Sequence, residues 1–336
     1  MRESVAAQEA LLTSPVVSVL ICTRNRADAL RQTLLALAGL CVPDQMPCEL
    51  IVVDNASTDD TAQVAQRCVL PNMAVRYVYE AQAGQSRARN TGLAAAQGRV
   101  LLFTDDDVRP PADWIAGMCG PILRGEADAV AGSVRFAPHL VKEWMTPAHR
   151  VRLAETGVSK PFYSPDRMTG ANMAFGKHVL ARVPAFDTEL GPGALGFMDD
   201  TLFSRQLLAA GYRMAAAYDV PVEHHFDASR LSYASLLKMA QGHEHSNAYV
   251  AWHWEHQEYK AVHVRLLVRR LKLALLRLTR LRERQGEAPP PWEENHLGVT
   301  TFFRQYLIER RRPRNYEKHG LVKKTAQGCD QRQKTD

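Results

Sequence analysis

Three consecutive aspartates, Asp105 to Asp107, follow the apolar run Leu101-Leu102-Phe103. Carboxylates this close together repel one another unless a cation neutralises them. Mg²⁺ or Mn²⁺ is typically held by one or two carboxylates, with phosphate oxygens of a substrate completing the coordination. These residue types therefore favour a divalent metal that holds a phosphate group. The alternatives are a solvated acidic turn, or Asp107 capping a helix that begins near Pro110-Pro111.

Other polar side chains have chemistry that suits a nucleotide. Asp54 follows the apolar run Ile51-Val52-Val53 and can accept hydrogen bonds from a base or ribose, although an Asx turn with Asn55 is an equal alternative. Arg87 and Arg89 open a predicted helix. A helix N-terminus with two guanidinium groups suits a phosphate or a nucleotide edge, and a solvated helix face is the alternative.

The second half of the chain carries further candidates. Asp199 and Asp200 begin another predicted helix. The pair can be a helix cap favoured by the dipole, or one carboxylate can be a general base. His224 can complete the coordination shell of a metal as a nitrogen ligand, and the adjacent His225 is an alternative for the same role. The histidines between residues 243 and 256 favour packing or surface roles over a separate zinc site.

The elements that must position these side chains follow from the hydrophobic pattern. Short β-branched runs alternate with helical patterns, which predicts βαβ units and a mostly parallel central sheet flanked by helices. Ligands bind at the carboxyl ends of strands in such sheets, so residues 22–26, 54–57 and 104–107 should converge on one edge. The expected strands are 16–21, 49–53, 75–79, 99–103, 128–134 and 214–217, and the expected helices are 27–40, 59–68, 85–97 and 199–210.

The chain after residue 231 reads mainly helical, and its last part is strongly basic. From Lys260 onward there are 19 Lys/Arg and 8 Asp/Glu, against 23 and 28 before it. Residues 262–284 form an amphipathic basic helix that can lie on an anionic membrane surface, although such helices more often pack against their own domain or a partner. Its apolar stripe is Val264, Leu267, Leu271, Leu275 and Leu278.

Composition narrows the class of protein. A chain of 336 residues with 46% hydrophobic side chains can bury a sizeable core. No apolar stretch reaches the ~18 residues needed to span a membrane, and the first residues predict no secretory signal. The six cysteines show no CxxC pair, which favours reduced thiols in a cytoplasmic protein.

Taken in order, these clusters resemble glycosyltransferase family 2, inverting enzymes of the GT-A fold. The resemblance covers about residues 15 to 235. Each segment alone is weak, but the ordered set is specific. The matching segments are VSVLICTRNRADALRQTLLAL, ELIVVDNASTDDT, GQSRARNTGLAAAQGRVLLFTDDDVRPPADW, TGANMAF, GFMDDTLFSRQLLAAGYR and VPVEHHFDASRL.

The resemblance implies roles for the individual residues. Asp106 would ligate Mn²⁺ or Mg²⁺ directly, with Asp107 supporting the metal and His224 as a ligand or diphosphate contact. Asp200 would be the catalytic base, with Asp199 in the preceding acidic position. Asn172 would line the acceptor side. The nucleotide-sugar pocket would be formed by Thr23, Arg26, Asp54 near the base, Arg87, Arg89 and Asp105 at the ribose.

The resemblance also implies an activity. A sugar would move from a UDP-, GDP- or dTDP-sugar to the hydroxyl of a sugar, lipid-linked glycan or other acceptor, in glycan, glycolipid or polysaccharide biosynthesis. No QxxRW stretch follows Asp200, which favours single addition over a processive synthase. No nucleic-acid partner is expected, and the protein is expected to be cytoplasmic or peripheral at the inner face of the membrane.

Two other readings remain open at this point. A sugar nucleotidyltransferase would also use a parallel sheet and a metal triplet, but CTRNRAD lacks the usual glycine-rich loop. A catalytically inactive membrane or nucleic-acid adaptor is disfavoured because Asp54, Asp105 to Asp107 and Asp200 are all present.

The expected organisation has four parts. They are an N-terminal extension (1–14), a GT-A domain (15–235, with a nucleotide-sugar half at 15–110 and an acceptor and catalytic half at 111–235), a helical basic extension (236–286), and a proline-rich break with a basic, partly flexible tail (287–336).

Overall fold

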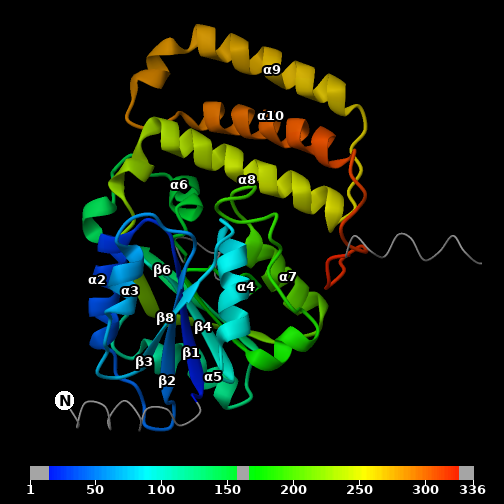
Figure 1. The fold of residues 1–336 in the computed structure, drawn as a ribbon. Helices are drawn as coiled ribbons and strands as arrows, with labels where there is room; N and C mark the ends of the chain where they lie inside the picture. Colours follow the sequence, from blue (N-terminus) through cyan, green and yellow to red (C-terminus); the bar gives the residue numbers. More distant parts are fainter. Residues whose placement is uncertain (1–14, 157–165, 325–336) are drawn as a thin grey trace, which may run out of the picture.

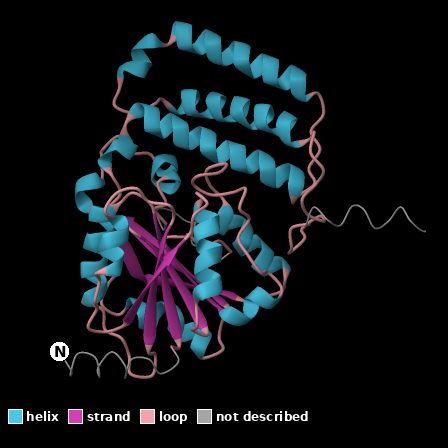
Figure 2. Ribbon diagram, in the orientation of Figure 1, coloured by secondary structure: helices cyan, strands magenta, loops and turns pink. Residues whose placement is uncertain are grey.

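The structure, a computed structural model, describes residues 15–156 and 166–324. The expected N-terminal extension and residues 325–336 of the expected tail lie outside this range. One eight-stranded sheet has helices on both faces, and three long helices stack beyond one end of it (Figures 1 and 2). In sheet order the strands are β3 (Ala74–Tyr79), β2 (Cys48–Asp54), β1 (Val17–Thr23), β4 (Val100–Asp105), β7 (Asn172–Gly176), β6 (Ala129–Phe136), β8 (Met214–His224) and β5 (Val108–Arg109).

The first half of the sheet has the parallel βαβ arrangement that the sequence predicts. β3, β2, β1 and β4 are all parallel. Because side chains alternate between the faces of a strand, Val17, Val19 and Ile21 join one core cluster while Leu20 joins the other. The first cluster includes side chains of α2 (Ala27–Ala38), α3 (Thr61–Gln66) and α5 (Trp114–Leu123), and the second includes side chains of α4 (Gln85–Ala95) and α7 (Asp199–Ala209).

The second half of the sheet is mixed rather than parallel. β7 pairs antiparallel with both β4 and β6, β6 pairs parallel with β8, and the short β5 pairs antiparallel with the end of β8. The last pairing sets Val108 opposite His224. This places the turn after β4 beside a histidine more than a hundred residues further along the chain.

The C-terminal helices form a stack beyond the sheet. α10 (Pro291–Glu309) lies between α8 (Tyr233–His253) and α9 (Val262–Thr279), so α9 is the outermost (Figure 1). The prolines expected to break the chain at residues 287–295 instead precede and begin α10. Proline is tolerated there because the first helical N–H groups have no intrahelical partner to lose.

Two expectations from the sequence concern membrane-spanning segments and cysteines. Within residues 15–156 and 166–324, no helix is long and apolar enough to cross a membrane. The described cysteines are free thiols, namely Cys22, Cys41, Cys48, Cys68 and Cys119.

Candidate active site

The three aspartates lie where β4 ends and the chain turns into β5. Asp105 is the last residue of β4, and Asp106 and Asp107 are buried in the turn. Thr23 ends the neighbouring β1, and its hydroxyl donates to Asp106 Oδ2 at 2.7 Å. The contact follows from the parallel register of these strands, which sets Cys22 opposite Asp105. The polar segments after the first and fourth strands therefore meet, as the sheet topology predicts.

Arg26 links two of the three carboxylates. Its guanidinium Nη1 donates to Asp106 Oδ1 and to Asp107 Oδ2, each at 2.7 Å. Burial raises the pKa of Asp106 to about 6, although Arg26 acts in the opposite direction. Burial would lower the pKa of Arg26, but the two carboxylates outweigh it and raise the pKa. Both oxygens of Asp106 are thus engaged by protein donors, one by Thr23 and one by Arg26.

Asp107 has a second partner in His224. His224 Nε2 is 3.2 Å from Asp107 Oδ1, and both side chains are almost completely buried. Burial would raise the pKa of Asp107, but His224 and Arg26 hold it below its usual range. Asp107 Oδ1 and His224 Nδ1 are buried atoms that no hydrogen bond satisfies.

This pair has the donor chemistry of a divalent metal site. A carboxylate oxygen and an imidazole nitrogen both coordinate Mn²⁺, and Asp107 Oδ1 forms no hydrogen bond, with His224 Nε2 as its ion-pair partner. No cluster of three or more metal-ligating side chains occurs among the described residues. A metal here would therefore draw its remaining ligands from a substrate or from water, as Mg²⁺ and Mn²⁺ sites beside phosphates do.

A second cluster forms around Arg89 on α4. The buried guanidinium pairs with the carboxylate of Asp199, and its Nη2 lies 3.9 Å from Asp105 Oδ1. Burial raises the pKa of both aspartates, while Arg89 acts against that rise. Gly170 packs directly on the guanidinium: an added Cβ would lie 1.9 Å from Nη2, so any larger residue would have to displace Arg89 from this position. Arg89 thus joins the aspartates after β4 to the acidic pair that begins α7.

The two members of that acidic pair have different environments. Asp199 is buried and ion-paired with Arg89. Asp200 is half-buried, and its carboxylate accepts the N–H groups of Gly170 at 2.8 Å and Thr201 at 2.6 Å. The Thr201 hydroxyl also donates to this carboxylate at 3.2 Å, so neutral donors hold Asp200 in place and no ion pair with a described cation does. Asp200 is therefore the carboxylate of the pair that forms no ion pair with Arg89.

Asp54 lies at the end of β2, separate from the pair formed by Asp107 and His224. Its Oδ1 accepts the N–H of Ser57 at 3.0 Å, and its Oδ2 accepts the hydroxyl of Tyr77 at 3.0 Å. The Ser57 contact closes a local turn, in line with the turn reading of this segment. Arg87 is half-buried beside Gly84 and forms no ion pair with a described carboxylate. The structure therefore does not draw Asp54 and Arg87 into the aspartate clusters.

The structure places Asn172 in the core rather than on an acceptor surface. Its side chain is fully buried, Trp114 Nε1 donates to its Oδ1 at 2.8 Å, and its Nδ2 donates to the Ser133 carbonyl at 2.8 Å. These bonds tie β7 to α5 and β6. Of the TGANM segment only Asn172 and Met173 belong to β7, and the Asn172 side chain satisfies buried polar groups of α5 and β6.

We expect Asn172→Ala to lower the free energy of unfolding by roughly 2–3 kcal/mol, because the Trp114 N–H and the Ser133 carbonyl would lose buried partners. Urea unfolding measures the change, and Asn295→Ala, at an exposed position on α10, is the matched control that should change little. Unaltered stability together with a raised KM for the acceptor would instead support the expectation that Asn172 lines the acceptor side.

Arg230 is a site residue that sequence reasoning did not single out. It lies in the short helix Ala228–Leu231, with its guanidinium 5.3 Å from the centre of the Phe226 ring. Burial lowers its pKa, whereas Asp105, Asp106 and Asp107 raise it. It is thus a further cation near the aspartates, besides Arg26 and Arg89. The only sequence signal was its place at the end of the VPVEHHFDASRL segment.

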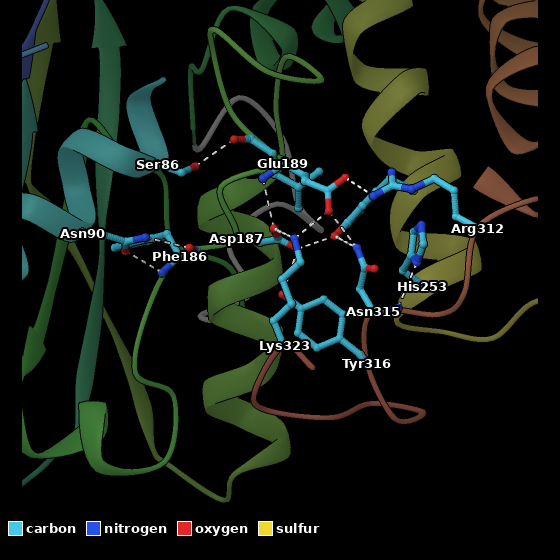
Figure 3. A network of polar contacts seen from close by, with 12 residues as sticks. Ser86, Asn90, Phe186, Asp187, Glu189, His253, Arg312, Asn315, Tyr316 and Lys323 are labelled. Carbon is cyan, nitrogen blue, oxygen red and sulfur yellow. Dashed lines mark hydrogen bonds and ion pairs between the residues drawn. The ribbon is translucent and has the colours of Figure 1, made fainter. Parts of the chain in front are cut away.

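A buried network holds the loop that leads to Asp199 and Asp200 (Figure 3). Asp187, near the start of this loop, accepts hydrogen bonds from the hydroxyls of Tyr249 at 2.6 Å and Tyr316 at 2.8 Å, and pairs with Lys323 at 2.7 Å. Ser86 on α4 donates to the Leu190 carbonyl at 2.8 Å. The loop is therefore fixed both by α4 and by the C-terminal segment, which adds Arg312 and Asn315 as donors to Glu189.

The later histidines have packing roles. His243 stacks on Phe197 with ring centres 3.9 Å apart, and the buried His253 contacts Glu309 at 3.1 Å.

His225 contacts Arg109 and Glu223, at the edge of a cavity of about 460 Å³ that Asp107 also lines. Of the two adjacent histidines, His224 is the one that faces the aspartates.

Two curated proteins with similar sequences are glycosyltransferases by name. Glycosyltransferase AglE of Haloferax volcanii is 28% identical over 211 residues, which cover 62% of this chain and 66% of that protein. The probable glycosyltransferase YdaM of Bacillus subtilis is 31% identical over 212 residues, covering 60% of this chain and 48% of that protein. The chain thus spans less than two thirds of the length of these curated relatives.

A solved structure shares the fold. The mannosyltransferase PcManGT from Pyrobaculum calidifontis, solved in complex with GDP-Man and Mn²⁺, superimposes with a TM-score of 0.52 at 20% identity, covering 92% of this chain and 80% of that one. At this identity the likeness concerns the fold, and it identifies the arrangement of sheet and helices as GT-A. Residues 18–185, half of the chain, match Glycosyl transferase family 2. The chain therefore belongs to glycosyltransferase family 2.

Proposed function

We propose that the protein is a metal-dependent, inverting glycosyltransferase that moves a sugar from a nucleoside-diphosphate sugar to an acceptor hydroxyl. The observation that carries the proposal is the meeting of two acidic clusters through Arg89, one suited to a metal and a diphosphate and the other offering a fixed carboxylate. Relatives named as glycosyltransferases, and one named as a succinoglycan biosynthesis protein of Rhizobium meliloti, support a place in glycan or polysaccharide biosynthesis.

On the donor side, we assign the nucleoside to the carboxyl ends of β1, β2 and β4. Asp105 is the most exposed of the three aspartates in its side chain, at 27%, and is suited to a ribose hydroxyl. Asp54 is assigned to the base, with Tyr77 fixing its carboxylate. We assign the guanidinium groups of Arg26 and Arg230, which lie near the aspartates, to compensating the negative charge of the diphosphate. Thr23, Arg87 and Arg89 complete the proposed donor set.

For the metal, the geometry favours a direct ligand other than Asp106, the residue that the family resemblance implies. Thr23 and Arg26 already engage both oxygens of Asp106, whereas Asp107 Oδ1 has no hydrogen bond and faces His224. We therefore assign Mn²⁺ or Mg²⁺ to Asp107 and His224, and assign to Asp106 the positioning of Arg26 and Thr23. When bound, the metal would stabilise negative charge on the departing diphosphate.

For the transfer step, Asp200 is the base. Its carboxylate would accept the proton of the acceptor hydroxyl as the oxygen forms a bond to the anomeric carbon. The bond from that carbon to the diphosphate breaks at the same time, and the nucleoside diphosphate leaves. Attack on the face opposite the leaving group inverts the configuration. Asp199 does not compete for the proton because Arg89 holds it as an ion pair.

A donor screen tests the proposal. The unfolding temperature would be measured with UDP-, GDP- and dTDP-sugars, each with and without Mn²⁺. One nucleotide class should raise the unfolding temperature by several degrees, and only when the metal is present, because binding to the folded state stabilises it. If no nucleoside-diphosphate sugar stabilises the protein under any of these conditions, the proposed donor site is wrong.

A further inference from the structure

Helix α9 has two apolar faces on opposite sides. At about 100° per residue, Val262, Leu266 and Leu273 fall on one side of the helix. Val262 and Leu273 are buried, and Arg277 on the same side pairs with Glu293 of α10 at 2.7 Å. This inner face accounts for the packing of α9 in the helix stack.

The opposite face is an uncovered apolar stripe. Its side chains are between 55% and 73% exposed, although a soluble helix normally turns such residues inward. α9 is the outermost helix of the stack, so no other described element covers it (Figure 1). The members of this outer stripe are Val264, Leu267, Val268, Leu271, Leu275 and Leu278.

Positive charges border the outer stripe on both sides. Arg265 and Lys272 fall along one edge and Arg270 along the other, and all three are exposed. None of them forms an ion pair with a described residue. The helix contains no Asp or Glu. An apolar band between two cationic edges is the pattern of a helix that lies in the plane of a membrane surface.

We propose that the outer stripe of α9 docks the protein on an anionic lipid surface. The apolar side chains would enter the boundary between headgroups and acyl chains, while Arg265, Arg270 and Lys272 contact lipid phosphates. A second copy fits less well, because two such helices would bring like charges together along both edges. A nucleic acid would satisfy the cations but leave the apolar band in water. The surface is distinct from the proposed active site and does not depend on it.

Vesicle co-sedimentation of the full chain tests this. Wild-type protein should bind vesicles of phosphatidylcholine with about 30% phosphatidylglycerol and bind phosphatidylcholine alone much less, and binding should weaken at about 0.5 M salt. Leu271→Gln/Leu275→Gln should lower the partition constant at least about tenfold. The matched control is Leu35→Gln/Val69→Gln, which removes two apolar side chains that are 64% and 71% exposed elsewhere, and it should bind like wild type.

A charge variant gives an independent readout. Arg265→Gln/Arg270→Gln/Lys272→Gln should lose the preference for anionic vesicles. The proposal is overturned if wild-type protein does not bind anionic vesicles at low salt, if either α9 variant binds as well as wild type, or if light scattering shows a dimer that Leu271→Gln/Leu275→Gln dissociates. In the last case the stripe joins two copies of the chain.

Discussion

Asp200→Asn is expected to lower kcat by about 10²–10⁴-fold, because asparagine cannot accept the acceptor's proton. The donor should bind as tightly as before, since Asp200 has no assigned contact with it. Steady-state transfer rates and donor-induced stabilisation measure these two effects separately. The substitution can satisfy only one of the two backbone N–H groups at this position, so a loss of about 1–2 kcal/mol in unfolding free energy is also expected.

Asp199→Asn provides the comparison, because the two residues are adjacent and only one is held by a buried arginine. It should lower the free energy of unfolding by roughly 3–5 kcal/mol, since Arg89 would keep its buried charge without its closest partner. A stable Asp199→Asn variant with no transfer activity, beside a fully active Asp200→Asn variant, would reverse the assignment of the base.

Asp107→Asn should reduce transfer at least about 100-fold and remove the effect of Mn²⁺ on donor binding, because the substitution weakens the metal ligand and leaves one fewer charge to hold a divalent ion. The unfolding temperature with donor would be compared with and without Mn²⁺. Asp113→Asn, an exposed aspartate that makes no side-chain cap bond at the start of α5, is the control and should respond like wild type.

Two further variants separate the roles within the metal site. His224→Gln should resemble Asp107→Asn, whereas His225→Gln should keep the Mn²⁺ response, because His225 faces Arg109 and Glu223 instead. If Asp106→Asn abolishes the Mn²⁺ response while Asp107→Asn preserves it, direct ligation belongs to Asp106, as the family resemblance implied.

The sequence predicted the first half of the fold well because its signals are local. Strands β1 to β4 are short, mainly apolar runs, each followed by a helical pattern or a turn, and parallel topology then brings Thr23 to Asp106. β7 was missed because the short segment after Asn172 has no period of its own and gains its strand partners from β4 and β6. β8 was predicted too short because the expected strand stopped before Asp219, a residue type that is depleted in strands, whereas the strand continues to His224.

Details of the site that depend on contacts between residues far apart in the chain could not be predicted from the spacing of residues in the sequence. The choice between His224 and His225 rests on the β5–β8 register, and the burial of Asn172 rests on Trp114. Asp199 and Asp200 are equivalent in sequence terms until Arg89, 110 positions earlier, pairs with one of them. The sequence predicted the outer stripe of α9, but the exposure of its side chains could be established only from the position of α10.

The Asp187 network constrains how this chain can be recombined with its relatives. Asp187 lies in the loop before the proposed base, whereas Tyr316 and Lys323, two of its partners, lie in the C-terminal segment. A chimera that takes the loop from one parent and the C-terminal segment from another separates a buried carboxylate from its donors. The two segments must therefore be inherited together, so a chimera should not have its junction between the loop and Lys323, as a boundary near residue 235 would.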